Sequence, residues 1–307
     1  MLSALLGMAY LVHSRARITE CVGAHYSDDD YMAWCGSAEF QDYEHGAYFW
    51  DLEPPVMDNV RKADVLFLGN SLGQSAFSTE HIRRYFAERG LTHHLLGFGF
   101  GEANSFPEAI FRKFGLTPRI VVANAASFFL DNPTGLASSV MFPSSATMLE
   151  YKIKRWLQPV HRRACEQGGA TLRKLVCGEA PTIYRSRRDG HWRHRNFPDG
   201  KRPLIFTGPP ESLPPSHPHV LAALRLRDAV AAWGGCLVLS STPSSDGRYV
   251  ANARAIAAAS GIPLIVPDQL SDLTAYDGEH LDPPSAERFS AGFTAGLDQA
   301  LTHCRTP

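Results

Sequence analysis

A serine that could act as a nucleophile stands at position 71, directly behind a short apolar run. Residues 65–68 have the composition of a buried strand, and Gly69 then allows the sharp turn that precedes a helix. A serine at such a turn lies at the carboxyl end of a strand, where open α/β sheets bind their ligands. The same pattern also fits an ordinary strand–turn–helix in which Ser71 only caps the helix.

A second group of chemically active residues lies near the other end of the chain, in the sequence YDGEHLDPPS. Asp277 and His280 are three residues apart, a spacing at which the carboxylate can accept a hydrogen bond from the histidine ring. That bond fixes the tautomer and leaves the other ring nitrogen free as a base. A serine needs such a base because its hydroxyl is a poor nucleophile at neutral pH. Alone, this segment also fits a solvated Asp-Gly turn with a surface histidine.

Together, the two segments resemble the SGNH (GDSL-like) hydrolase superfamily. That family has a Gly-Asp-Ser-Leu block, or a variant of it, after its first strand and an Asp-x-x-His-Leu block near its C-terminus. Here the blocks are GNSL at 69–72, with Asn70 in place of the usual aspartate, and DGEHL at 277–281. The resemblance runs from residue 63 to about residue 301. It implies that Ser71 is the nucleophile, His280 the base and Asp277 the carboxylate that orients the base.

The resemblance also implies donors for an oxyanion hole between these two blocks. The second block falls in GFGFGEANS, where the backbone N–H of Gly101 is the expected donor and Gly99 is the alternative register. Turn glycines without any catalytic role would give the same pattern. The third block normally supplies an asparagine side chain, but Asn124 lies too early, inside a strand, and Asn132 too late. Ser127 is the residue nearest the expected position.

A long basic insertion, residues 133–219, follows the third expected strand. Residues 151–202 contain fourteen Lys and Arg against four Asp and Glu, although the whole chain has a formal net charge of −1. Arginine beside tryptophan suits anionic or sugar ligands, through bidentate hydrogen bonds and stacking. We therefore expect Arg185, Arg188, Trp192 and Arg193 to line or overhang the Ser71 crevice. A solvated charged loop would give the same composition, and no nucleic-acid-binding motif accompanies it.

The first twelve residues, MLSALLGMAYLV, form an uninterrupted apolar run. The run is shorter than the roughly 20 residues that a membrane-spanning helix needs, and no basic residue precedes it as in a signal peptide. It also lacks the polar face of a surface helix. We interpret residues 1–18 as the remnant of a membrane anchor, the alternative being an apolar helix packed on the domain.

The six cysteines have no spacing typical of a metal site, so we expect no structural metal. In an exported chain they could instead form disulfides. Cys165 and Cys177 are the preferred pair, and Cys21 and Cys35 are the second choice. Cys236 lies in the apolar run CLVLS and is expected to be a buried core thiol.

Strand-like and helix-like segments alternate along most of the chain, which favours a parallel sheet covered on both faces. With the resemblance, this gives a three-layer α/β/α sandwich with a parallel flavodoxin-like (SGNH) sheet and the long basic insertion. The expected divisions are the anchor remnant at 1–18, an irregular N-terminal segment at 19–62, and the α/β domain at 63–307, with the insertion at 133–219 inside it.

The resemblance implies a serine esterase or O-acyltransferase that works through an acyl-enzyme. Its expected substrate is an acyl ester, in the first place an acetyl ester, of a cell-surface or extracellular glycan, or a small acyl ester. We expect no metal or organic cofactor, no nucleic-acid partner, and a periplasmic or membrane-anchored location with membrane association through the N-terminus. The alternative is a non-catalytic module of the same fold that binds an anionic glycan through the basic insertion.

Overall fold

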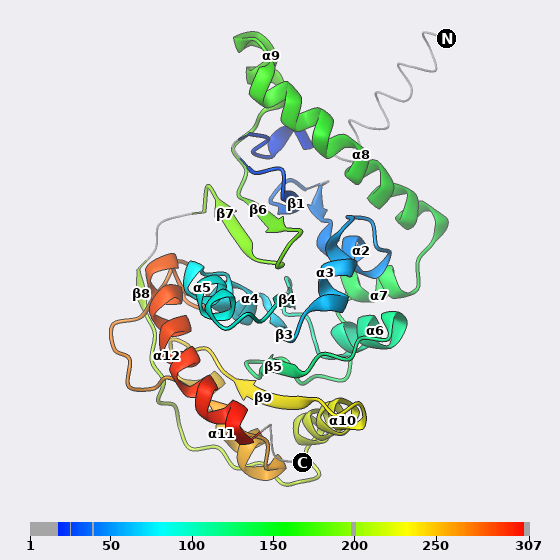
Figure 1. The fold of residues 1–307 in the computed structure, drawn as a ribbon. Helices are drawn as coiled ribbons and strands as arrows, with labels where there is room; N and C mark the ends of the chain where they lie inside the picture. The colour runs from blue at the N-terminus through cyan, green and yellow to red at the C-terminus, as the bar shows by residue number, and fades with distance from the viewer. Residues whose placement is uncertain (1–17, 25, 39, 198–200, 304–307) are drawn as a thin grey trace. The chain divides into compact units, whose positions relative to one another are not determined.

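The computed structural model describes residues 18–303 except 25, 39 and 198–200, and it divides into two compact units (Figure 1). Unit 1 consists of Met1–Met57, Gly135–Arg188 and Trp192–Phe197. Unit 2 consists of Asp58–Thr134, Asp189–His191 and Pro198–Pro307. Each unit is described by itself below.

Unit 2 is built on a five-stranded parallel sheet in the spatial order β10-β9-β5-β3-β4. The strands are β3 (Val65–Asn70), β4 (His93–Phe98), β5 (Ile120–Asn124), β9 (Cys236–Ser240) and β10 (Leu264–Ile265). Counted along the chain, this order is 2-1-3-4-5, a common doubly wound arrangement. Nearly every residue of β3, β4, β5 and β9 is buried, as expected for parallel strands that are covered on both faces.

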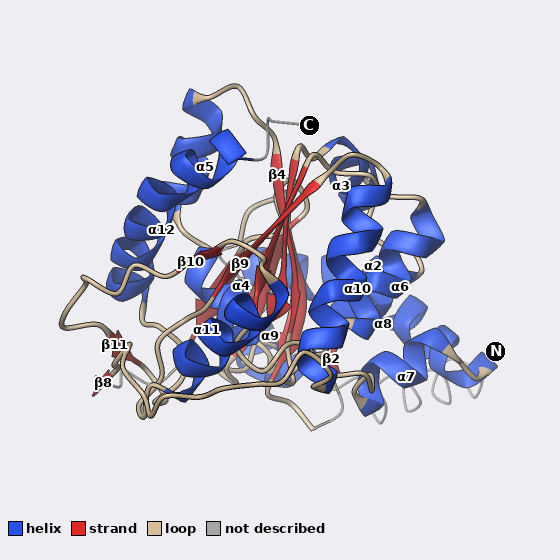
Figure 2. Cartoon of the chain, turned by 90° about the horizontal axis from the view of Figure 1, so that it is seen from below, coloured by secondary structure: helices blue, strands red, loops and turns tan. Residues whose placement is uncertain are grey.

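Helices cover both faces of this sheet, with α5 and α12 on one side and α6 and α10 on the other (Figure 2). The helices of unit 2 are α4 (Ser71–Phe77), α5 (Glu80–Glu88), α6 (Ser105–Phe114), α10 (Pro218–Ala232), α11 (Arg248–Ser260) and α12 (Pro283–His303). Alternate strand residues face opposite layers, so Phe67 packs against Phe77 and Phe293 in one core. A short antiparallel pair, β8 (Arg202–Pro203) and β11 (Thr274–Ala275), completes the unit. The predicted α/β class with a parallel sheet between helices is confirmed.

Unit 1 contains an antiparallel sheet in the order β2-β1-β6-β7. The strands are β1 (Asp30–Cys35), β2 (Gln41–Asp42), β6 (Thr182–Ser186) and β7 (Trp192–Arg195). Its helices are η1 (Ile18–Glu20), α2 (Glu44–Phe49), α7 (Gly135–Met141), α8 (Ser145–Gln167) and α9 (Ala170–Val176), and α3 (Val56–Lys62) crosses into unit 2.

The N-terminal segment is not irregular, and the chain does not divide at the predicted boundaries. Strand β1 pairs along its length with β6, which comes from the predicted insertion. The two segments therefore share one sheet, although about 150 residues separate Asp30 from its partner Ser186. The pattern of residues 30–35 indicates which side chains can be buried but not which distant strand lies alongside, so the sequence alone could not identify this pairing.

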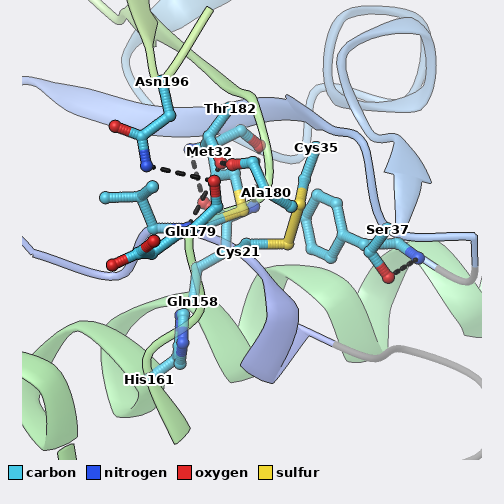
Figure 3. The surroundings of a disulfide bond; sticks show 12 residues. Cys21, Met32, Cys35, Ser37, Gln158, His161, Glu179, Ala180, Thr182 and Asn196 are labelled. Atoms are coloured by element: carbon cyan, nitrogen blue, oxygen red, sulfur yellow. Dashed lines mark hydrogen bonds between the residues drawn. A yellow bond between two sulfur atoms is a disulfide. The ribbon is translucent and has the colours of Figure 1, made fainter. Parts of the chain in front are cut away.

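Two disulfides lie within unit 1. Cys21 is bonded to Cys35 at the end of β1 (Figure 3), and Cys165 of α8 is bonded to Cys177 just behind α9. Their Cα atoms are 5.9 and 5.6 Å apart, within the range for an unforced bridge. Both predicted pairs are thus present. The prediction for Cys236 is wrong, because this residue is disulfide-bonded and not a free core thiol.

The predicted anchor remnant at 1–18 falls almost wholly outside the described residues. Within the described ranges, no helix combines the length and the apolar character needed to cross a membrane.

Candidate active site

Ser71 is the first residue of α4 and directly follows β3. Asn70 caps this helix, because its Oδ1 accepts a hydrogen bond from the backbone N–H of Leu72 at 3.0 Å. Its Nδ2 donates to the carbonyl oxygen of Ala126 at 2.8 Å. An ionised aspartate could make the first contact but not the second, since it has no hydrogen to donate. Asn70 therefore ties the end of β3 to the segment that follows β5.

Ser71, His280 and Asp277 form a continuous hydrogen-bonded line in unit 2. The Nε2 atom of His280 lies 2.8 Å from the Oγ of Ser71, and its Nδ1 lies 2.6 Å from the Oδ2 of Asp277. These contacts join a nucleophile to a base and the base to an orienting carboxylate, which is the geometric signature of an activated serine. Ser71 and His280 are both partly exposed, so a ligand can reach the two reacting atoms.

The loop that carries Asp277 and His280 is closed by its own backbone. Ala275 bridges Leu281, and the N–H of Tyr276 donates to the carbonyl of His280 at 3.1 Å. The Oδ1 of Asp277 accepts two more backbone N–H groups, from the next two residues after Gly278, at 3.0 and 2.8 Å. The ring of Tyr276 stacks on the imidazole with centroids 5.6 Å apart. These contacts hold the imidazole in place before any ligand arrives.

The charge state of Asp277 fixes which ring nitrogen of His280 carries the proton. Burial tends to raise the pKa of Asp277, but the hydrogen bond and charge of His280, with the two backbone N–H groups, hold it well below its usual range. The carboxylate is therefore ionised at neutral pH and can only accept. It follows that Nδ1 of His280 carries the proton and Nε2 accepts from the hydroxyl of Ser71.

The predicted oxyanion residues lie beyond the strands on either side of β3. Gly101 comes three residues after β4 and Ser127 three residues after β5. Both are exposed and have positive φ, 65° and 52°. A left-handed backbone is easy for Gly101 but strained for Ser127, and such strain concentrates at functional sites. Ser71 itself opens α4, so its N–H is among those that lack an acceptor within the helix.

Asn124 does not replace the missing asparagine of the third block. It is fully buried at the end of β5, its Oδ1 accepts the N–H of Ala126 at 3.1 Å, and its side chain packs closely against Gly73 of α4. It therefore supports the nucleophile helix from behind and does not face a ligand. Asn132 is exposed beyond the end of β5.

Gln74 is a positioning residue that sequence reasoning missed. It is buried on α4, one turn after Ser71, where its Oε1 accepts the N–H of Gly97 in β4 at 3.1 Å and its Nε2 donates to the carbonyl of Gly190 at 2.6 Å. Both partners belong to unit 2 but come from distant parts of the sequence. No local pattern around residue 74 could have indicated this role.

Two of the predicted ligand-binding residues are core residues of unit 1. Arg185 is fully buried, with its Nη1 2.7 Å from Glu44 Oε2, and Trp192 is almost fully buried, with its Nε1 3.0 Å from the same oxygen. The guanidinium also lies over the ring of Tyr48, 4.2 Å from its centroid. The prediction that Arg185 and Trp192 face a ligand is therefore wrong. Their acidic partner comes from α2, and the count of cations in the insertion did not include it.

The other two residues differ from this pair. Arg193 is paired with Asp30 and also donates to the hydroxyl of Ser27 at 3.2 Å, so its charge too is matched by the N-terminal segment. Arg188 is exposed, and its backbone N–H donates to the hydroxyl of Ser186. All four residues belong to unit 1, whereas Ser71, Asp277 and His280 belong to unit 2.

Two clusters among the described residues bring potential metal ligands together. In unit 2, the Nε2 atoms of His93 and His191 lie 2.9 Å apart, and Asp189 is held by the guanidinium of Arg83 at 2.8 and 3.1 Å. In unit 1, Asp42, Glu44 and His45 are all buried. His45 is hydrogen-bonded to Asp42 at 2.8 Å, and Glu44 is bonded to Arg185, as described above. In both clusters the ligand atoms are hydrogen-bonded to protein groups, which is the arrangement of buried polar networks.

A cavity of about 610 Å³ lies in unit 1, lined by α8 and by the segments before β1 and α3. Two of its arginines are paired, Arg162 with Asp28 at 2.7 Å and Arg187 with Glu53 at 2.6 Å. The lining thus carries both signs of charge and is not uniformly positive.

Comparison with known proteins found no match to a family model, a curated protein or a solved structure.

Proposed function

We propose that the chain is a serine ester hydrolase or O-acyltransferase of the SGNH type. The observation that carries this proposal is the line of contacts from Ser71 through His280 to Asp277, at 2.8 and 2.6 Å. The strand order 2-1-3-4-5 is the flavodoxin-like order, and Ser71 follows β3 at the switch point between β3 and β5. The segment between β5 and α10 would then be an insertion into this fold.

In the first half-reaction, Nε2 of His280 takes the hydroxyl proton of Ser71 while Oγ bonds to the ester carbonyl carbon. The carbonyl electron pair moves onto oxygen, and the backbone N–H groups of Ser71 and Gly101, with Ser127, would donate to this oxyanion. The intermediate then expels the alcohol oxygen, which takes the proton from His280. The acyl group remains on Oγ.

In the second half-reaction, water or a sugar hydroxyl gives its proton to His280 and attacks the acyl-enzyme, and Ser71 regains its proton when it leaves. Removal of one oxyanion donor costs roughly 10²–10³ in rate in other acyl-transfer enzymes. Since the third-block asparagine is missing, we expect slow turnover unless Ser127 supplies an equivalent donor.

We further propose that the substrate is an acetyl ester of a cell-surface or extracellular glycan and that the chain works outside the cytoplasm, in the periplasm or held at a membrane by its N-terminus. The substrate class depends on the family resemblance. The location is supported by the bridges Cys21–Cys35 and Cys165–Cys177, because disulfides persist in oxidising compartments and are rare in the cytosol.

The test is labelling with a fluorophosphonate probe, combined with hydrolysis of a small acetyl ester. We expect the probe on Ser71, no labelling or turnover in Ser71→Ala, and both in Ser78→Ala. Ser78 is the matched control because it ends the same helix and its hydroxyl donates to the carbonyl of Gln74 at 2.6 Å. Absence of labelling and of ester turnover in the parent chain would leave the non-catalytic glycan-binding module as the better explanation.

A further inference from the structure

Helix α8 in unit 1 exposes several apolar side chains on one side. Leu149, Trp156 and Val160 are 58%, 65% and 48% exposed. Their spacing of seven and then four residues puts them on one side of the helix, and half-buried Ile153 lies on the same side. Exposed apolar residues that are contiguous in this way mark interaction surfaces, whereas single ones do not.

The opposite side of α8 carries polar residues that are buried and bonded. Gln158 both accepts from and donates to the backbone of Met32 in β1, at 2.8 and 3.1 Å. Lys154 donates to the carbonyl of Asp42 at 3.0 Å, and the ring of His161 bonds the last carbonyl of α9 at 2.7 Å. These contacts fix the rotation of α8 about its axis. If the helix turned its apolar side toward the rest of unit 1, the backbone groups that these side chains now bond would be buried without partners.

The exposed side of this helix is bordered by cations. Lys152 and Arg163 are four residues before and seven residues after Trp156, so they lie beside it on the helix surface. Both carboxylates of α8 are already paired within the helix, Glu150 with Lys154 and Glu166 with Arg162. Five exposed cations of α8 and α9 have no ion-pair partner among the described residues: Lys152, Arg155, Arg163, Arg173 and Lys174.

Helix α9 also exposes apolar and basic side chains. It buries none of its residues, exposes Leu172 and Leu175, and is joined to α8 by the bridge Cys165–Cys177. The chain enters the described structure at η1, which packs against both α8 and α9.

We propose that the outer face of α8, made of Leu149, Ile153, Trp156 and Val160 with Lys152 and Arg163 at its border, docks on an anionic phospholipid surface. Tryptophan and leucine with bordering Lys and Arg are the composition of helices that lie in a membrane interface. A protein partner is a poorer fit, because protein interfaces are depleted in lysine and unmatched cations of one sign would need an equally acidic partner. An anionic leaflet supplies that charge with no fixed geometry.

The test is co-sedimentation of the full chain with phosphatidylcholine vesicles, with and without phosphatidylglycerol. We expect the double variant Lys152→Gln/Arg163→Gln to lower the partition coefficient on anionic vesicles by roughly 25-fold, at about fivefold for each cation lost near the surface, and to change it little on neutral vesicles. Leu149→Gln/Trp156→Gln should weaken binding to both. Raised salt should weaken binding of the unaltered chain to anionic vesicles only, a readout that depends on no variant.

The matched controls lie in unit 2. Lys62→Gln/Arg84→Gln removes two exposed cations, and Leu221→Gln removes an apolar side chain that is 42% exposed on α10. Both should bind like the parent chain. Equal vesicle binding by the α8 variants and the parent would overturn the proposal, because binding would then depend on another part of the chain. Light scattering could instead show that the parent chain is a dimer and that the α8 variants are monomers with unchanged vesicle binding. That result would overturn the proposal, because the outer face of α8 would then bind a second copy of the chain.

Discussion

Replacement of Asp277 by asparagine would separate two tasks of this side chain. Its Oδ1 accepts the N–H groups of Glu279 and His280 and shapes the loop, while its Oδ2 bonds Nδ1 of His280. The carbonyl oxygen of asparagine can keep the first task. Its amide nitrogen is a donor, so Nδ1 would have to accept and the proton would move to Nε2. Nε2 could then no longer take the proton of Ser71.

The expected loss follows from this change of tautomer. The same exchange in a serine-protease triad lowers kcat by about 10⁴, so we expect Asp277→Asn to lower kcat by roughly 10³–10⁴, or about 4–5.5 kcal/mol of transition-state stabilisation. Folding stability should change by less than about 1 kcal/mol, because the loop bonds are kept and the Asp277 side chain is 41% exposed. Activity and stability should thus separate.

The assay is steady-state hydrolysis of a small acetyl ester beside urea unfolding of each variant. Asp277→Ala is the comparison, because alanine removes the loop acceptor as well and should lower the unfolding midpoint in addition to the activity. A value of kcat/KM for Asp277→Asn above about a tenth of the parent value would refute the role of Asp277 in setting the tautomer.

The pH dependence gives a further check on the same residue. The pKa of Asp277 is lowered in the folded chain, so its contribution to stability is present above the unfolded pKa, about 3.9, and is lost as pH falls through the lower folded value. We therefore expect no loss of activity from protonation of Asp277 between about pH 4 and 7. If activity instead falls between pH 7 and 4 in parallel with protonation of the Asp277 carboxylate, the role assigned to Asp277 would be contradicted.

Two further predictions concern the supports of the fold and the site. Glu44→Gln should lower the free energy of unfolding by about 3–5 kcal/mol, because it leaves the fully buried Arg185 uncompensated. Asp58→Asn, which breaks an exposed ion pair, should lower it by about 1 kcal/mol or less. Equal urea midpoints for the two variants would contradict this prediction. Gly73→Ala would place a Cβ 2.6 Å from that of Asn124, so we expect α4 to shift. The free energy of unfolding should fall by about 1–3 kcal/mol, and kcat should fall by a larger factor than KM rises. Kinetics like those of the parent chain would contradict this prediction.

The candidate catalytic residues could be predicted because each half of the site is local. The turn around Ser71 and the loop with Asp277 and His280 are short segments whose residue types already imply their geometry. Their meeting in space follows from the alternation of strands and helices, since the carboxyl ends of parallel strands share one edge of a sheet.

Unit 1 could not be predicted in this way because its contacts are long-range. Arg185 and Trp192 share Glu44, which lies more than 140 residues earlier in the sequence. Charge counted over residues 151–202 records their cations and omits carboxylates that pair with them from elsewhere in the sequence. A dense run of arginine is therefore ambiguous between a ligand site and a buried network until the partners are known.

The positive charge that has no carboxylate partner in the folded chain does not lie where the sequence has most cations. Residues 185–195 have the highest density of cations, yet Arg185, Arg187 and Arg193 are matched by carboxylates inside unit 1. Among the described residues of unit 1, exposed cations without an ion-pair partner lie on α8 and α9, where the local sequence contains fewer cations and the neighbouring exposed residues are apolar. Because unmatched charge is more available to a partner than paired charge, the basic residues between 151 and 202 favour binding by α8 and α9 over binding by the β6–β7 hairpin.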